Sequence, residues 1–407
     1  MDARAYARHK PAMAGDWLRQ ADWLHGQRAR GWGWLLAALN LATLAWLLLT
    51  ARDGVDRNGF LIGSDFLSFW TTGQMLVQGG NVYDPAAHAA AQRGFFSHGD
   101  ATTAFFYPPF FLPFCWPLGW LPYFPALALW LGVTGGLFVW AVRAWFRDLG
   151  LGAPPWMWIA AFPPVLVGIT HGQTAFLVPA LLGGGVVLAG RRPWLAGVLI
   201  GLAVIKPQAG LMVPLVLLLT GQWRTILAAA ASTLALGLLA TLAFGAESWL
   251  AWWRVLGPAQ AARAQGAIGY AKMMSVFAGA RLLGAPMGLA YGLQAASALL
   301  AAALLAREAW GRRCDTGLGA AMLLGGMLAT PFLLDYDLVL LAFPLAWLLA
   351  QGFGPWGRIT AAAGFGLAAF ARPLALAAGI PLAPMVLWAL FGVVIAAIRA
   401  QRLRARG

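Results

Sequence analysis

Runs of apolar residues follow one another along almost the whole chain of 407 residues, with short polar connections between them. Runs such as 32–50 and 226–244 approach the roughly 20 residues that an α-helix needs to cross about 30 Å of hydrocarbon. We expect twelve such spans, at residues 31–50, 122–142, 156–170, 173–189, 194–205, 208–220, 225–245, 287–306, 317–333, 338–350, 359–371 and 381–398. The pattern predicts an all-α polytopic membrane protein with about 12 transmembrane helices.

Two connections, 51–121 and 246–286, are much longer than the others, and the first contains its own helix signals. Residues 65–80 place large apolar side chains on one helical face and end in a glycine pair, which predicts an interfacial helix. Asp84 and Pro85 then have the pattern of an N-cap and a first helical residue. The five prolines of "FFYPPFFLPFCWPLGWLP", 105–122, exclude a regular span and favour a short helix dipping into the surface.

Composition excludes a soluble protein, since 61% of the residues are hydrophobic and only 10% are charged. A soluble chain of this length cannot bury so much apolar surface, because its core grows more slowly than its length. The partners expected from composition are therefore membrane lipids.

The net charge of +14 follows the rule that cytoplasmic loops are rich in Lys and Arg, so a nucleic-acid partner is not expected. With both termini in the cytoplasm, nineteen of the 28 Lys and Arg residues and six of the 14 acids fall inside. We divide the chain into a basic cytoplasmic tail 1–30, one transmembrane domain 31–398 and a basic cytoplasmic tail 399–407. Residues 51–121 and 246–286 then face outward.

Soluble-type catalytic motifs are absent, so no nucleotide cradle is expected. No cofactor is expected either, and no metal is required, although acids near a phosphate leave a metal open. Instead, the predicted topology brings a set of polar groups near the outer membrane plane. They are Asp65, Tyr83, Asp84, Tyr107, His171, Gln173, Lys206, Gln208, Asp335 and Asp337.

Each of these groups also has a purely structural interpretation. Asp84 is best explained as a helix cap, and Asp65 can be a cap as well. His171 and Gln173 flank a tight turn, and Lys206 can extend its ammonium group to the interface from the end of a span. Asp335 and Asp337 can complement the dipole of a following helix. These interpretations do not explain why so many polar groups gather on one face.

The stretches "GSDFLSFWTTGQMLVQGGNVYDP", "FFYPPFFLPF", "GITHGQTAFLVPALL" and "GLAVIKPQAGLMVPLVLLLTGQWR" occur in this order. Together they resemble glycosyltransferase family 87, integral membrane enzymes of the polyprenol-phosphate-mannose-dependent mannosyltransferase type. The resemblance covers about residues 30–350 and implies the GT-C architecture, with a first outward loop that carries the catalytic acid. By this resemblance Asp65 corresponds to the catalytic carboxylate, and Lys206 and the "DYD" segment border the same cavity.

The implied chemistry is transfer of a hexose, with mannose expected, from a polyprenyl-phosphate-sugar donor to a lipid or glycan acceptor outside the cytoplasm. Asp65 would be the general base, and a single base with direct displacement predicts inversion. Lys206 can stabilise the leaving phosphate, and Asp335 or Asp337 can hold sugar hydroxyls. Tyr107, His171, Gln173 and Gln208 complete the expected donor-phosphate or substrate-binding set.

Two other functions remain open from the sequence. A proton-coupled transporter or lipid flippase also places ionisable groups in a membrane, although usually near the middle of its spans. Here most acids fall at the predicted ends of spans, which favours surface chemistry. A non-catalytic scaffold would leave the polar set unexplained.

The charge distribution makes a direct topological prediction. Reporter fusions after Gly99 and after Gly266 should be extracytoplasmic, and fusions at Arg192 and Arg404 should be cytoplasmic. Paired alkaline phosphatase and green fluorescent protein fusions measure both sides. A cytoplasmic signal at Gly99 would contradict the assignment of the polar face to the outside.

Overall fold

The computed structural model of the chain describes residues 14–96, 102–151 and 156–404. Within these residues the chain is helical, with three isolated β-bridges and no strand. Parts of both expected tails, 1–13 and 405–407, lie outside the described residues. The described part of the tails is helical except for residues 21–25, because α1 spans Ala14–Gln20, α2 begins at Gly26 and α19 continues to Arg404.

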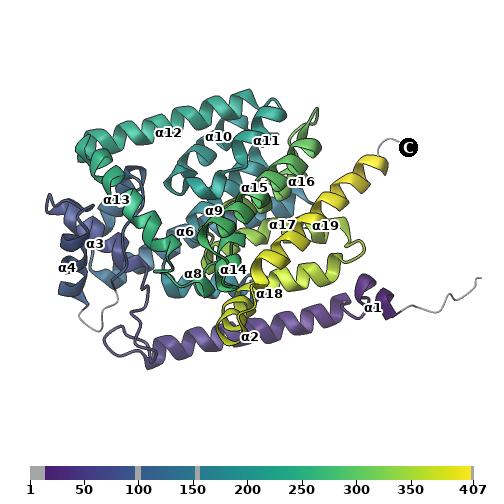
Figure 1. Cartoon of the computed structure of the whole chain (residues 1–407), viewed down its shortest axis with the longest axis horizontal. Helices are drawn as coiled ribbons and strands as arrows, with labels where there is room; N and C mark the ends of the chain where they lie inside the picture. The colour runs from purple at the N-terminus through teal and green to yellow at the C-terminus, as the bar shows by residue number, and fades with distance from the viewer. Residues whose placement is uncertain (1–13, 97–101, 152–155, 405–407) are drawn as a thin grey trace, which may run out of the picture.

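Among the described residues, six helices are long and apolar enough to cross a membrane. They are α2 (Gly26–Thr50), α6 (Tyr123–Asp148), α12 (Trp223–Phe244), α15 (Met287–Ala309), α18 (Gly357–Ala378) and α19 (Leu382–Arg404). In Figure 1, α2 and α12 run along opposite edges of the molecule. Leu234 and Leu242 of α12 are 73% and 77% exposed, a surface that is stable against hydrocarbon rather than water. The chain is therefore an all-α, multi-pass membrane protein.

The remaining predicted spans correspond to shorter or broken helices. They are α7 (Trp156–Ala161), α8 (Pro163–His171), α9 (Leu177–Leu188), α10 (Pro193–Leu202), η3 (Ala203–Ile205), η4 (Pro207–Gly210), α11 (Val213–Leu219), α16 (Thr316–Ala329), η6 (Asp335–Leu341) and α17 (Ala342–Gln351). The expectation of about 12 transmembrane helices is therefore confirmed only in part, since half of the predicted segments are long helices. Prolines explain two of the breaks, because Pro163 and Pro207 each start a new helix.

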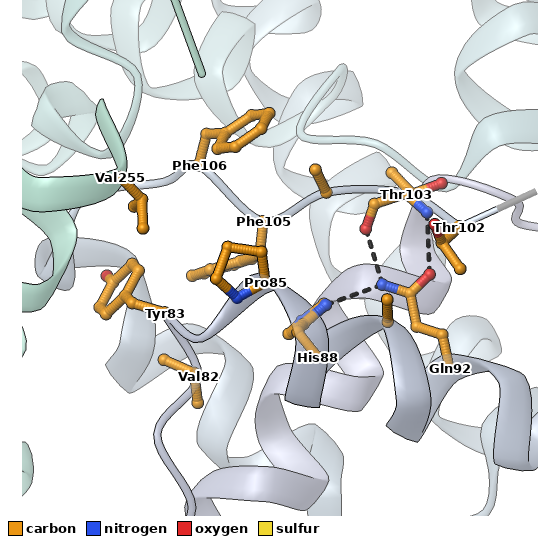
Figure 2. Close-up of a pocket in the computed structure, with 12 residues that line it drawn as sticks. Val82, Tyr83, Pro85, His88, Gln92, Thr102, Thr103, Phe105, Phe106 and Val255 are labelled. Atoms are coloured by element: carbon orange, nitrogen blue, oxygen red, sulfur yellow. Dashed lines mark hydrogen bonds between the residues drawn. The ribbon is translucent and has the colours of Figure 1, made fainter. Parts of the chain in front are cut away.

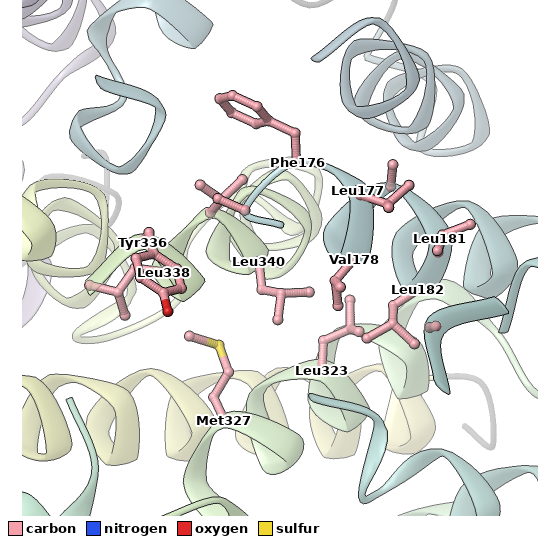
Figure 3. Close-up of a cluster of buried hydrophobic side chains, with 14 of the residues drawn as sticks. Phe176, Leu177, Val178, Leu181, Leu182, Leu323, Met327, Tyr336, Leu338 and Leu340 are labelled. Atoms are coloured by element: carbon pink, nitrogen blue, oxygen red, sulfur yellow. The ribbon is translucent and has the colours of Figure 1, made fainter. Parts of the chain in front are cut away.

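Two of the short helices, α9 and α16, lie inside the protein, where they do not have to span hydrocarbon alone. The 14 residues of α16 reach only about 21 Å at 1.5 Å per residue, yet all of Gly317–Ala329 is buried. Figure 3 shows Val178 and Leu182 of α9 beside Leu323 of α16 in the main hydrophobic cluster. Irregular backbone between such helices is tolerated because protein, and not lipid, surrounds it.

The first long connection contains α3 (Phe66–Val77), α4 (Pro85–Phe95), η1 (Pro109–Phe111), α5 (Leu112–Cys115) and η2 (Trp116–Trp120). The expected helix starts and the proline-broken segment are therefore present. However, α3 does not lie on the surface with one face exposed, because eight of its 12 residues are buried. Its Gly73 packs directly on the backbone of Gly119 in η2.

The second long connection, 246–286, contains α13 (Glu247–Ala264), η5 (Tyr270–Lys272) and α14 (Val276–Leu282). In Figure 1, α13 descends from the end of α12 beside the helices of the first connection. The Trp252 indole of α13 donates a hydrogen bond of 3.3 Å to the carbonyl oxygen of Phe106. The two long connections are therefore in contact with each other.

The Gly73–Gly119 contact predicts a stability effect. A Cβ added at Gly119 would lie 2.2 Å from the carbonyl of Gly73, and the backbone cannot move aside cheaply. We expect Gly119→Ala to lower the free energy of unfolding by about 1–3 kcal/mol, measured by thermal unfolding in detergent. Gly94→Ala is the control, since nothing lies within 4 Å of a Cβ there and alanine favours the helix. Equal stability of the two variants would contradict close packing at Gly119.

Candidate functional site

The turn that precedes α3 is held against the α8–α9 turn by backbone hydrogen bonds. The Gly63 amide donates to the Thr170 carbonyl and the Asp65 amide donates to the His171 carbonyl, both at 3.0 Å. Gly63 has φ +77°, a conformation that favours glycine, and its carbonyl accepts a 2.8 Å bond from the Tyr123 hydroxyl. These contacts fix the backbone of Asp65.

The side chain of Asp65 does not cap the helix that follows it. Asp65 occupies the N-cap position of α3 but makes no side-chain cap hydrogen bond. Its Oδ2 instead lies 3.4 Å from Gln173 Nε2 and 3.9 Å from Lys272 Nζ, and 14% of the side chain is exposed. Asp84 behaves differently, because its Oδ1 accepts hydrogen bonds from the amides of Ala86 and Ala87. Capping therefore explains Asp84 and does not explain Asp65.

Gln173 is oriented by two donors on the side away from Asp65. Its Oε1 accepts hydrogen bonds from the Tyr107 hydroxyl at 2.7 Å and from the Thr174 amide at 2.8 Å. Burial raises the pKa of the Tyr107 hydroxyl, which therefore stays neutral and remains a donor. The amide Nε2 of Gln173 is left to face Asp65, so Tyr107 and Gln173 form a chain of hydrogen bonds ending at the carboxylate.

Lys206 is committed to a buried ion pair with Asp337. The Lys206 ammonium donates to Asp337 Oδ1, and both side chains are largely buried. The other oxygen of Asp337 accepts a 3.1 Å hydrogen bond from the Leu334 amide. Lys206 therefore does not simply extend to the interface from the end of a span. Removing one partner of such a pair leaves an uncompensated buried charge.

Residues on both sides of Asp337 extend the cluster. Asp335 is buried and lies 3.7 Å from the guanidinium of Arg372 on α18. The Tyr336 ring lies under two ammonium groups, with Lys206 Nζ at 4.8 Å and Lys272 Nζ at 5.8 Å from its centroid. Segments that are far apart in the sequence thus meet around Tyr336.

Two expected site residues are less closely involved. His171 has its Nδ1 2.9 Å from the Val167 carbonyl, so that nitrogen carries the proton, and its ring lies 6.1 Å from the Tyr336 ring. Gln208 is half-buried in η4 and makes no side-chain hydrogen bond within the residues that the structure describes. The structure brings Asp65, Tyr107, Gln173, Lys206, Asp335 and Asp337 into the cluster and leaves Gln208 beside it.

Four residues in or beside the cluster were not predicted from the sequence, namely Tyr336, Lys272, Arg263 and Arg372. Tyr336 was overlooked as the middle residue of "DYD", and the three cations were counted only toward topology. One signal was available, since the chain has just three lysines and two of them, Lys206 and Lys272, meet in this cluster. Lysine is rare in this chain, where most basic residues are arginines, so the position of each lysine is a signal of the site.

A pocket of about 190 Å³ lies next to the cluster, beside the extended segment 102–106. Figure 2 shows Tyr83, His88 and Phe105 around it and the Gln92 side chain bound to the backbone of Thr103. Burial lowers the pKa of His88 to about 4, so this imidazole is neutral. The Thr103 hydroxyl donates in turn to the Ser64 carbonyl at 3.2 Å, which ties the pocket wall to the residue before Asp65.

Neither a metal cluster nor a disulfide is found in the part of the chain that the structure describes. No group of three or more His, Cys, Asp or Glu side chains is placed to hold a metal ion there. Cys115 and Cys314 are both free. The chemistry that this arrangement can perform is proton transfer at Asp65 beside a group of cations that attract an anion.

Comparison with known proteins gives one match. The family model described as glycosyltransferase family 87 matches residues 105–334. No curated protein and no solved structure matches the chain. The matched range contains Tyr107, Gln173, Lys206 and Lys272 and ends just before Asp335; Asp65 lies outside it.

The Lys206–Asp337 pair predicts a double-mutant effect on stability. Lys206→Met and Asp337→Asn should each lower the free energy of unfolding by about 3–5 kcal/mol, because each leaves a buried group without its partner. The double variant should be more stable than the sum of the two losses implies, by about 0.5–3 kcal/mol. Chemical unfolding in detergent measures all three.

The matched control is Arg191→Met. Arg191 pairs with Asp148 at 3.0 Å, but 73% of its side chain is exposed, so its loss should cost less than about 1 kcal/mol. If Lys206→Met were as mild as Arg191→Met, the buried pair would not be what holds η4 and η6 together.

Proposed function

We propose, from the premise that the chain belongs to glycosyltransferase family 87, that it transfers a hexose from a polyprenyl-phosphate-sugar donor to a lipid or glycan acceptor. Membership of the family makes the chain a membrane glycosyltransferase. The finer assignments are our proposal. They are mannose as the sugar, the extracytoplasmic face of the inner or plasma membrane as the place of reaction, and cytoplasmic termini.

The observation that carries this proposal is the state of the Asp65 side chain. It makes no cap hydrogen bond, is partly exposed, and has only the long contacts to Gln173 and Lys272. A general base must be able to reach an acceptor hydroxyl and take its proton. Asp335 and Asp337 are less suited to this task, because both are buried and paired with a cation.

We propose that Asp65 acts as the general base of a direct displacement. As the acceptor oxygen attacks the anomeric carbon, its proton passes to Asp65, and the bond from that carbon to the phosphate oxygen breaks. The electron pair of the broken bond leaves with the lipid phosphate. A single displacement inverts the configuration at the anomeric carbon, since retention would require a carboxylate nucleophile.

The surrounding residues support the two substrates in this proposal. Lys206 and Lys272 place positive charge near Tyr336, where the leaving phosphate gains negative charge. We assign Tyr107 and Gln173 to orienting Asp65, and Asp335 and Asp337 to sugar hydroxyls through their remaining lone pairs. His171 and Gln208 would contact substrate at the edge of the cluster. The donor needs no nucleotide cradle, because its lipid can remain in the bilayer.

A transporter or flippase of lipid-linked precursors is the alternative, and product analysis separates the two. Purified protein in proteoliposomes should convert a radiolabelled polyprenyl-phosphate mannose and an acceptor lipid into a new glycoside. Neither transport nor scaffolding forms a glycosidic bond. Movement of the donor across the bilayer without formation of a new glycoside would contradict the enzymatic proposal.

The sharpest prediction compares two aspartates. Asp65→Asn keeps the size of the side chain but cannot accept a proton, so turnover should fall by about 10²–10⁴. Asp84→Asn makes the same chemical change at a helix cap, where Asn caps about as well as Asp, and it should stay active. Initial rates in proteoliposomes, at matched protein content, measure both. Turnover by Asp65→Asn within a few-fold of the unmodified protein would refute the general-base role.

A further inference from the structure

Arg263, in the last turn of α13, is a partly buried cation without a hydrogen-bonding or ion-pair partner among the described residues. Its guanidinium lies 4.7 Å from the centroid of the Phe106 ring and 5.9 Å from that of Phe332. Its Nε is buried and has no hydrogen-bond acceptor, and the side chain forms no ion pair with any described residue. Stacking on aromatic rings is favourable for a guanidinium, but it satisfies none of the N–H donors in the plane of the group.

The two rings beside Arg263 come from segments that also supply residues of the Asp65 cluster. Phe106 is the neighbour of Tyr107, and Phe332 precedes Asp335 by three residues. Burial dominates the pKa of the Tyr107 hydroxyl and raises it, while the charge of Arg263 is close enough to act in the opposite direction. The guanidinium is therefore within electrostatic reach of the site.

The charges of the cluster leave Arg263 as the unmatched cation. Each of the three carboxylates has one basic partner: Lys272 lies 3.9 Å from Asp65, Lys206 pairs with Asp337, and Arg372 lies 3.7 Å from Asp335. Arg263 is the fourth cation and has no carboxylate within 4.0 Å among the described residues. With His171 left aside, the cluster carries one positive charge more than it carries negative charges.

The buried Nε of Arg263 has no acceptor, and a buried N–H donor of a charged group is costly unless an acceptor, such as the oxygen of an anion, joins it. The planar, forked N–H groups of a guanidinium match the oxygens of a phosphate and bind them in a bidentate manner. A sugar-phosphate-lipid is a phosphate diester with a single negative charge, which equals the excess charge of the cluster. A carboxylate ligand would match the charge as well, but the proposed donor brings a phosphate to this position.

We propose that Arg263 binds the phosphate group of the lipid donor directly, whereas the Lys206 ammonium stays bound to Asp337. This assignment rests on the proposed function and deepens it. When the bond between sugar and phosphate breaks, the phosphate becomes a monoester and gains a second negative charge. In the same step Asp65 takes the acceptor's proton and loses its charge, so Lys272 loses its counter-ion and can attract the phosphate. The total charge of the site is therefore unchanged by the reaction.

The test separates phosphate binding from turnover. The probe is undecaprenyl phosphate in nanodiscs, with undecaprenol as the neutral comparison, and the binding constant is measured for the unmodified protein, Arg263→Gln and Arg263→Lys. Charged hydrogen bonds of this kind predict that Arg263→Gln binds the phosphate about tenfold to a hundredfold more weakly. Arg263→Lys should lie between, because it keeps the charge without the fork. The donor KM should rise in the same order.

The control is Arg254→Gln, which removes an exposed arginine from the same helix and should bind as the unmodified protein does. If Arg263→Gln binds undecaprenyl phosphate normally, Arg263 merely packs against the two rings and the assignment is wrong. If the unmodified protein binds the alcohol as tightly as the phosphate, the assignment is also wrong. If Arg263→Gln does not yield a monodisperse protein, Arg263→Lys replaces it, and normal binding of undecaprenyl phosphate by Arg263→Lys contradicts the assignment.

Turnover in proteoliposomes tests the underlying function independently. An unmodified protein that binds the phosphate through Arg263 but forms no glycoside would overturn the proposed transferase reaction and leave the Arg263 site standing. If Arg263→Gln shows normal turnover and normal phosphate binding, the Arg263 assignment is wrong and the proposed transferase reaction stands.

Discussion

Burying a charge inside an apolar helical protein is costly unless an opposite charge or a set of hydrogen bonds accompanies it. The site of this protein is organised around that constraint. The Lys206–Asp337 pair joins η4 to η6, and the Asp335–Arg372 contact joins η6 to α18. Lys272 and Asp65 bring the two long connections together at 3.9 Å. Satisfying each carboxylate thus also brings distant segments together.

The broken helices provide the places where such groups can lie. A continuous transmembrane helix uses its own backbone hydrogen bonds and leaves no polar backbone for a site. Here the chain leaves helical geometry at the α8–α9 turn, around Lys206 and before η6, and each of these breaks supplies residues of the cluster. The inner helices α9 and α16 are surrounded by protein, and the long helices α2, α12 and α15 present much of the apolar surface outside. Short inner helices and long outer ones therefore have separate roles.

Sequence patterns predicted the membrane class, the helix starts in the first connection and all three acidic residues of the cluster. Prediction succeeds where neighbouring residues in the sequence determine the structure. Asp84 is an example, because its side chain caps α4 as the Asp-Pro pair predicts. The number of about 12 spans is not confirmed, because hydropathy measures apolar character and cannot distinguish lipid from protein as the surroundings. The buried α16, for example, has the hydropathy of a span. Arg263, Lys272 and Arg372 were missed because a cation in a loop or at a helix end usually faces solvent. Only the tertiary contacts with Phe106, Tyr336 and Asp335 reveal their position.

The differing strength of the carboxylate contacts supports the proposed general-base role, in which Asp65 changes its charge while the other acids of the cluster keep theirs. Asp337 has a close ammonium donor and also accepts from the Leu334 amide, so protonating it would remove two charge-assisted bonds. Asp65 has a 3.4 Å contact to an amide and a 3.9 Å contact to an ammonium, both beyond the usual length of a strong hydrogen bond. Protonation therefore disrupts least at Asp65. Because backbone bonds to His171 and Tyr107's contact with Gln173 keep its surroundings fixed, the carboxylate can accept a proton without rearrangement of the cluster.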